Sequence, residues 1–318
     1  MPQRFRIAPT VRRLAGAALI ATLIAALAGC AAPPAPHGFR GTPLTVYAAG
    51  DIADCRYRMP ESSGAAATAW LVEAGLAAHP GARVLTLGDH TYPVGTPAEF
   101  SDCYEPTWGR FRERTLPTPG NHEYYTPGAP GYYAYFGATA VPEQDGYYSV
   151  QLGKWHVISL NSTLRGARAD AQLAWLKDDL ARHPALCTLA FWHHPRYSSG
   201  GHAGNAFMAP LWQALADGGV DLALAGHDHD YERFAPQDAH GVRDDARGMR
   251  QFVVGTGGAW LTPMRFAADN SEARNNFSLG VLRLDLFDNG YTWEFLAVAS
   301  ETDPGVAAYT DRGATPCH

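Results

Sequence analysis

Five short clusters of polar residues recur along the sequence, and each begins where an apolar run ends. They are Gly50-Asp51, Gly88-Asp89-His90-Thr91-Tyr92, Gly120-Asn121-His122-Glu123, Trp192-His193-His194-Pro195 and Gly226-His227-Asp228-His229. By itself a Gly-Asp pair usually marks a turn, and a lone histidine is more often packed or solvated than a ligand. Together the clusters supply oxygen and imidazole donors, which suit first-row metal ions. The occurrence of all five clusters in one sequence, in this order, predicts a metal centre.

The apolar runs of the sequence are short and rich in β-branched and aromatic residues, which predicts β-strands. They span residues 44–49, 83–87, 155–160, 187–192 and 220–225. Helical patterns lie between several of them, at 64–78 and at 170–180, where Leu173, Leu176 and Leu180 share one face and Asp170 can cap the start. Strands that alternate with helices predict an α/β fold with polar residues displayed at the strand ends.

The last third of the sequence changes to hairpin patterns. Residues 251–254 lead into the turn Gly255-Thr-Gly-Gly258, and residues 281–287 can pair with 291–296 across Asp288-Asn-Gly290. Hairpins join antiparallel strands, so the sequence predicts a mixed rather than a purely parallel sheet.

The N-terminus has the layout of a secretory signal. Arg4, Arg6, Arg12 and Arg13 precede the apolar run 14–28, which ends in Leu27-Ala-Gly-Cys30. This ending resembles a bacterial lipobox, which predicts a lipoprotein-type signal peptide over 1–29, a lipid anchor at Cys30 and a stiff tether over 30–41. An ordinary secretory signal cleaved nearby is the alternative, and Arg12-Arg13 is a poor match to twin-arginine export. One domain over 42–318 follows.

Charge and cysteine usage support an exported protein. The chain carries 25 basic and 31 acidic side chains, and loss of residues 1–29 removes four arginines, leaving 21 against 31, or −10. Such a surface argues against nucleic acid as a partner. Beyond Cys30 the sequence holds Cys55, Cys103, Cys187 and Cys317, which allow three pairings. We favour Cys55–Cys103, near the early metal motifs, and Cys187–Cys317, which would clamp the C-terminus.

Taken in order, the polar clusters resemble the motifs of the calcineurin-like metallophosphoesterases. Within that superfamily the purple acid phosphatases are most similar, because Asp89-His-Thr-Tyr92 matches their Asp-x-x-Tyr. The similarity covers essentially the whole domain after the tether. It implies a four-layer α/β/β/α sandwich, in which two mixed β-sheets pack face to face with helices outside.

The resemblance also implies a ligand set for two metal ions. Many members of the superfamily begin with Asp-x-His, but this chain reads Asp51-Ile-Ala53, so Tyr92 would supply the missing donor; the alternative is that Tyr92 is merely packed and the site is one ligand short. The implied ligands are Asp51, Asp89, Tyr92 and His229 for the first metal, and Asp89, Asn121, His193 and His227 for the second. His193 is chosen over its neighbour His194 because the family pattern is His-x-Pro.

The donor types favour particular metals and roles. A phenolate from Tyr92 favours Fe(III) in the first site, with a divalent ion (Fe, Zn or Mn) in the second. Once a bridging hydroxide is counted, these ions and their ligands leave a net charge of about +1 for an incoming anion.

By the same resemblance, His122 would contact the phosphoryl group and protonate the leaving alkoxide. His202, in a glycine-rich segment, is a second acid candidate, with a solvated loop histidine as the alternative.

The predicted activity is hydrolysis of a small-molecule phosphate monoester by attack of a metal-bound hydroxide. A phosphodiesterase acting on cyclic nucleotides or phospholipid head groups could use the same metals. A non-catalytic metal-binding lipoprotein is the alternative from another class, and it is disfavoured because every ligand position is filled. Contact with a membrane is predicted only through the anchor at Cys30, and the sequence does not indicate an oligomeric state.

Overall fold

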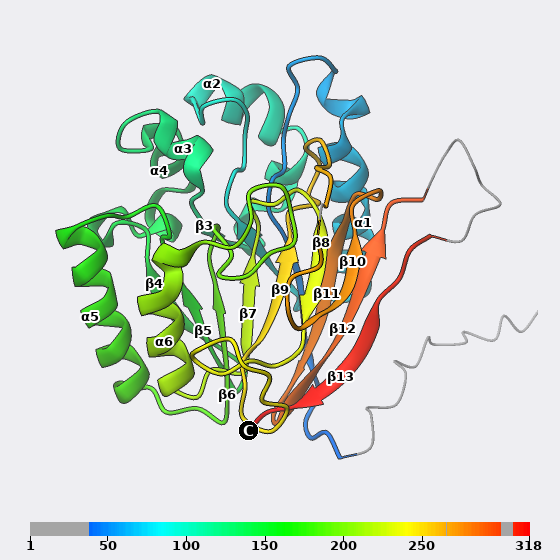
Figure 1. Cartoon of the computed structure of the whole chain (residues 1–318). Helices are drawn as coiled ribbons and strands as arrows, with labels where there is room; N and C mark the ends of the chain where they lie inside the picture. The colour runs from blue at the N-terminus through cyan, green and yellow to red at the C-terminus, as the bar shows by residue number, and fades with distance from the viewer. Residues whose placement is uncertain (1–37, 265, 300–307) are drawn as a thin grey trace, which may run out of the picture. The chain divides into compact units, whose positions relative to one another are not determined.

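The computed structural model describes residues 38–264, 266–299 and 308–318 (Figure 1). The signal predicted over 1–29, the anchor at Cys30 and most of the tether lie outside the described residues, so they stay predictions. No helix in the described part of the chain is both long enough and apolar enough to cross a membrane.

A first mixed sheet is built from both ends of the domain. Its strand order is β13-β12-β11-β1-β2-β3, in which β1, β2 and β3 are parallel and β11, β12 and β13 add antiparallel neighbours. The strands are β1 (Leu44–Ala49), β2 (Arg83–Leu87), β3 (Thr115–Thr118), β11 (Gly280–Phe287), β12 (Gly290–Ala297) and β13 (Arg312–Pro316). The hairpin predicted across residues 288–290 is therefore confirmed as β11 and β12.

A second mixed sheet has the strand order β10-β8-β9-β7-β6-β5-β4, with β5, β6, β7 and β9 parallel. Its strands are β4 (Tyr148–Leu152), β5 (Trp155–Ser159), β6 (Cys187–Phe191), β7 (Leu222–Ala225), β8 (Tyr231–Phe234), β9 (Arg250–Val254) and β10 (Ser271–Asn275). Parallel strands send their carboxyl ends to one edge of a sheet, so the polar clusters after β6 and β7 lie at the same edge.

Helices cover the outer faces of the two sheets. The α-helices are α1 (Gly64–Ala78), α2 (Pro97–Glu99), α3 (Asn121–Tyr125), α4 (Pro130–Phe136), α5 (Ala167–Arg182) and α6 (Ala209–Asp217). Short segments of tighter or wider helix span 60–62, 100–104, 108–114, 137–140, 142–144 and 206–208. Figure 1 shows α5 and α6 side by side across the second sheet, and α1 beside the first. The predicted four-layer α/β/β/α arrangement is confirmed.

Local sequence explains where the longer helices begin. Ser63 accepts a hydrogen bond from the Ala66 amide and caps α1, whose predicted bounds of 64–78 are confirmed. The start predicted for α5 is wrong. That helix begins after Gly166, whose φ of 58° is left-handed, and Asp170 lies in its first turn instead of capping it.

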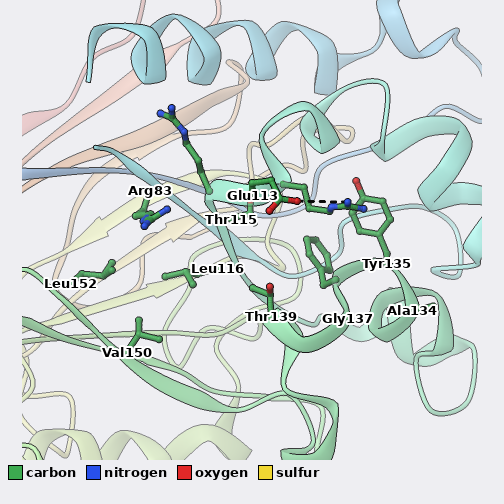
Figure 2. A pocket seen from close by; sticks show the side chains of 13 residues that line it. Arg83, Glu113, Thr115, Leu116, Ala134, Tyr135, Gly137, Thr139, Val150 and Leu152 are labelled. Carbon is green, nitrogen blue, oxygen red and sulfur yellow. Dashed lines mark ion pairs between the residues drawn. The ribbon is translucent and has the colours of Figure 1, made fainter. Parts of the chain in front are cut away.

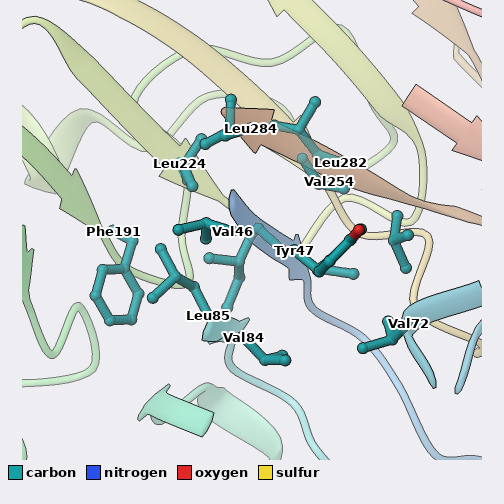
Figure 3. Packing of buried hydrophobic residues seen from close by; sticks show 14 of the residues in the cluster. Val46, Tyr47, Val72, Val84, Leu85, Phe191, Leu224, Val254, Leu282 and Leu284 are labelled. Carbon is teal, nitrogen blue, oxygen red and sulfur yellow. The ribbon is translucent and has the colours of Figure 1, made fainter. Parts of the chain in front are cut away.

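The core lies between the sheets and fixes the strands whose ends carry the polar clusters. Val46 of β1 and Leu85 of β2 pack in the same cluster as Phe191 of β6 and Leu224 of β7, all fully buried (Figure 3). Burial of one such side chain contributes roughly 1.5–3 kcal/mol. Apolar contact across the two sheets therefore sets the distance between their strand ends.

Two disulfides add covalent restraint, and both predicted pairs are confirmed. Cys55 joins Cys103, and Cys187 at the start of β6 joins Cys317 beyond β13. The second bond ties the two sheets together across 130 residues of sequence. Disulfides persist in oxidising compartments, so the pair is typical of a protein exported from the cytosol.

Candidate metal centre

The structure brings all seven predicted metal ligands to one end of the sandwich. The five polar clusters follow β1, β2, β3, β6 and β7, which are the strands whose carboxyl ends meet there. Three of these strands belong to the first sheet and two to the second. The candidate site therefore lies between the sheets, and its donors come from both.

Three donors form the first group. The Tyr92 hydroxyl oxygen lies 3.1 Å from Asp51 Oδ1 and 3.1 Å from His229 Nε2, and these last two atoms are 3.2 Å apart. A triangle of this size leaves room for one cation at about 2.0–2.2 Å from each corner, the usual bond length to such donors. This is the geometry that a shared cation requires.

A second group surrounds His193. Its Nε2 lies 3.0 Å from Asn121 Oδ1, 3.2 Å from His227 Nδ1 and 3.2 Å from Asp89 Oδ2. Donor atoms of Asp51, Asp89 and His193 all lie within 4.8 Å of one another, so the two groups are adjacent. Asp89 stands next to both, as a bridging carboxylate must.

Backbone carbonyls orient two of the imidazoles. Nδ1 of His193 lies 2.8 Å from the Leu87 carbonyl, and Nδ1 of His229 lies 2.6 Å from the Trp260 carbonyl. A carbonyl accepts only from a protonated nitrogen, so in the neutral ring each Nε2 is the lone-pair donor that faces the site. Both rings are thus set in the tautomer that a metal ligand needs.

The glycines that open the clusters make room for the donors. A Cβ on Gly120 would lie 2.1 Å from Asp89 Oδ1, and one on Gly226 would lie 2.6 Å from Asp51 Oδ2. Asp51, Asp89 and His227 themselves have φ of 60°, 49° and 73°, in the left-handed region that costs a residue other than glycine of order 1–3 kcal/mol. The fold holds these ligands in conformations that they would not adopt freely.

Charges inside the site compensate one another. Burial by itself would lower the pKa of His193, but the carboxylates of Asp89 and Asp51 outweigh it and raise the pKa to about 9. Burial would raise the pKa of Asp51, yet the imidazoles of His229 and His193 and the His227 amide hold it below its usual value. Without metal, the carboxylates are therefore balanced by protonated imidazole.

Tyr92 is a ligand candidate whose ionisation is strongly opposed in the metal-free site. Burial, followed by the carboxylates of Asp51 and Asp89, raises the pKa of Tyr92 well above its usual value. Its hydroxyl lies within hydrogen-bonding distance of Asp51 Oδ1. A phenolate at this position needs a cation of high charge beside it.

The two candidate acids lie on different sides of the donor cluster. His122 Nε2 is 3.8 Å from Asp89 Oδ2, its Nδ1 is 2.6 Å from the Pro93 carbonyl, and its ring packs 4.3 Å from that of Tyr92. His202 is exposed, and its ring centre lies 4.6 Å from that of His227. The structure therefore brings both residues to the site, His122 beside the first group and His202 beside the second.

Glu123 is a residue of the site that the sequence analysis missed. Its buried carboxylate accepts hydrogen bonds from the amides of Asp89 at 3.0 Å, His90 at 2.8 Å and Gly120 at 2.7 Å. It thereby ties the turn after β2 to the turn after β3 and fixes two ligand segments at once. The signal was a glutamate three residues after Gly120, which is the spacing of a capping box at the start of α3.

A separate cavity of about 670 Å³ lies away from these residues. Arg83, Arg112 and Arg114 line it together with apolar side chains such as Leu116 and Leu152 (Figure 2). It contains none of the predicted ligands or acids.

A family model for calcineurin-like phosphoesterases matches residues 44–231. This span is more than half of the chain and contains every predicted ligand. The chain therefore belongs to the calcineurin-like phosphoesterase family.

The relatives of this chain include two purple acid phosphatases of a plant. Purple acid phosphatase 23 of Arabidopsis thaliana is 29% identical over 206 residues, which cover 57% of this chain and 44% of that protein. Purple acid phosphatase 18 of the same plant is 34% identical over 120 residues, covering 35% of this chain and 26% of that protein. The matches span less than half the length of these relatives.

Solved structures share the fold. Purple acid phosphatase PPD1 from yellow lupin (Lupinus luteus) seeds has a TM-score of 0.63 at 20% identity, over 85% of this chain and 54% of that one. GAP50, the anchor in the inner membrane complex of Plasmodium, also has a TM-score of 0.63, at 15% identity. That match covers 86% of this chain and 89% of GAP50. At these identities the similarity establishes two mixed sheets with flanking helices.

Metal binding should release the proton that His193 carries in the metal-free protein. With a pKa of about 9, His193 is protonated at neutral pH in the metal-free protein, and a metal ligand must be neutral. The apparent affinity of its group should therefore fall about tenfold for each pH unit below 9. Calorimetric zinc titrations at pH 7.5, in two buffers of different ionisation enthalpy, count the protons.

His193→Asn should lower that proton count by about one, whereas His240→Ala, a change of an exposed histidine, should leave it unchanged. An equal count in His193→Asn and the unaltered protein would contradict the assignment of charge to this residue.

Proposed function

We propose that the chain is a dinuclear-metal phosphoesterase that hydrolyses phosphate monoesters. The observation that carries the proposal is the packing of two donor groups around Asp89, with neighbouring donors 3.0–3.2 Å apart. Membership of the phosphoesterase family and similarity to plant purple acid phosphatases support it. The first ion would be held by Asp51, Asp89, Tyr92 and His229, and the second by Asp89, Asn121, His193 and His227.

Two bound cations would supply a water nucleophile active at neutral pH and would neutralise phosphoryl charge. Side chains of the protein would orient the metal ligands and protonate the leaving group. The Asn121 side-chain amide nitrogen donates to the Tyr125 hydroxyl at 2.9 Å, which turns its carbonyl oxygen toward His193. The Pro93 carbonyl at His122 Nδ1 leaves Nε2 as the atom that faces Asp89 and the substrate. His122 is thus placed to give a proton to the leaving alkoxide.

We propose Fe(III) for the first ion and a divalent ion for the second. A phenol whose pKa is raised by burial and by two carboxylates binds best as phenolate to a hard trivalent ion, while the amide and two imidazoles of the second group suit Fe, Zn or Mn as divalent ions. Export follows from the disulfides, and attachment through a lipid at Cys30 is proposed from the sequence alone.

Hydrolysis of paired chromogenic esters tests the proposal. The metal-loaded protein should cleave p-nitrophenyl phosphate with a higher kcat/KM than bis-p-nitrophenyl phosphate, across pH and with metal analysis of the same sample. Asp89→Asn should lower turnover at least about 100-fold, because loss of groups that only support a ligand already costs 10–100-fold. Asp102→Asn changes an exposed carboxylate and is the matched control. Preference for the diester would indicate a phosphodiesterase, and two bound metals without turnover would indicate a metal-binding protein.

The oxidised, iron-loaded protein should be coloured. A visible charge-transfer band from the Tyr92 phenolate to iron should vanish in Tyr92→Phe and persist in Tyr57→Phe, because Tyr57 is 90% exposed and lies outside the donor groups. Absorption spectra of both variants at equal iron content measure this. A colourless, fully active protein that contains only divalent metals would remove the reason to assign Fe(III).

The two acid candidates should differ in their kinetics. His122→Ala should lower kcat by about 10²–10⁴-fold with both metals retained, the usual range for a general acid. His202→Ala should have a milder effect that grows with the pKa of the leaving alcohol. Turnover of a series of aryl and alkyl phosphates, with metal analysis, separates the two residues. Loss of metal from His122→Ala would make that residue structural.

A further inference from the structure

A cavity of about 400 Å³ opens beside the first donor group. Most of its lining comes from two segments, one following β1 and the other following β9, and Leu279, just before β11, completes it. Its lining includes Asp54, Tyr57, Arg58, Trp260 and Leu261. None of these residues is among the metal ligands or acids assigned above.

Trp260 connects this cavity to the site. Its carbonyl oxygen lies 2.6 Å from His229 Nδ1, and its ring centre lies 4.7 Å from that of His229 and 5.1 Å from that of Tyr92. The same ring therefore contacts two ligand candidates and forms a wall of the cavity. A substrate whose phosphoryl group lies at the metal centre can extend its alcohol portion along this ring.

Two aromatic side chains of the cavity wall, Tyr57 and Trp260, are exposed to solvent. Tyr57 is 90% exposed and Trp260 is 47% exposed, although large aromatic side chains usually gain by burial. The guanidinium carbon of Arg56 lies 5.1 Å from the Trp260 ring centre and 5.8 Å from that of Tyr57. Arg56 thus lies near both rings and supports them by cation–π contact.

The walls are held in place before any ligand arrives. Asp54 binds Arg56 through two hydrogen bonds of 2.9 and 2.8 Å, and the Cys55–Cys103 disulfide anchors the same segment. On the opposite wall, the Ala259 amide donates to the Asp51 carbonyl at 2.9 Å. A pre-formed wall loses little entropy when a ligand binds.

We propose that this cavity is the subsite for the alcohol portion of the substrate, and that it selects phosphate esters whose alcohol carries a flat aromatic ring. A flat ring can stack on Trp260 and Tyr57, and the planar guanidinium of Arg58 at the exposed rim can stack on it or meet its acceptors. The proposal rests on the phosphomonoesterase activity proposed above and names the class of its substrate.

Adenosine 5′-monophosphate and ribose 5-phosphate test the subsite. In both, the leaving group is the primary alkoxide at C5 of a ribose, so their ratio of kcat/KM reports mainly the aromatic ring and little of the chemistry of the leaving group. The protein should favour the adenosine ester by roughly 5- to 150-fold, the range that stacking of a base on an aromatic side chain supplies. Tyr57→Ala and Trp260→Leu should each move this ratio toward one. Phe277→Ala, which removes another exposed aromatic ring, should leave the ratio unchanged.

The ratio of kcat/KM also distinguishes a failure of the subsite from a failure of the phosphatase activity, because a defect at the metals lowers turnover of both esters together. Equal kcat/KM for the two esters in the unaltered protein would overturn the subsite and leave the phosphatase standing. If neither ester is hydrolysed, the activity is wrong, and calorimetric binding of the two esters to the metal-loaded protein still tests the cavity. Binding of the adenosine ester no tighter than ribose 5-phosphate would then overturn it.

Discussion

Two carboxylates, Asp51 and Asp89, lie buried close together at the ends of adjacent strands, and their charge is the constraint on which the site depends. Removing such an ion from water costs several kcal/mol unless it is paired. In the metal-free protein, imidazoles provide the compensation, which is why the pKa of His193 rises to about 9. Cations at the same place would compensate the carboxylates more strongly. The charges of the site therefore suit an exchange of protons for the cations proposed above.

The fold supplies what this exchange needs. The hydrophobic core sets the distance between the two sheets, so donors that follow β1 and β2 meet donors that follow β6 and β7. Left-handed backbone at Asp51, Asp89 and His227 points the donors inward, and Gly120 and Gly226 leave space that any Cβ would fill. Glu123 then fixes two of the turns through their amides. The strain is local, whereas the packing that sustains it extends across both sheets.

Much of this could be read from the sequence because the signals are local. A strand that ends in Gly-Asp or Gly-Asn-His, and a hairpin turn at Asp288-Asn-Gly290, are visible in a few consecutive residues. The α/β class and the mixed sheet were predicted on that basis. The four-layer arrangement was implied by the resemblance of the ordered clusters to the phosphoesterase motifs, and the two disulfides were favoured among three pairings from the positions of the cysteines in the sequence. Glu123 was missed because its partners are backbone amides of two turns that are distant in sequence. The cavity at Trp260 was missed for a similar reason, since most of its lining follows β1 of the first sheet and β9 of the second, and these segments meet only when the two sheets pack face to face. The start of α5 was misplaced because Gly166, and not Asp170, ends the preceding turn.

The backbone and the side chain of Trp260 have different tasks at the site. Its backbone carbonyl orients His229, a task that any residue at this position could perform. Its ring lines the cavity and contacts Tyr92, a task that depends on the side chain. In the proposed roles, the ligand His229 depends on the carbonyl and the substrate contact depends on the ring, so side-chain changes here would alter which ester is accepted while the hydrogen bond to His229 remains. A shared metal centre can then serve different substrates through the residues that follow β1 and β9.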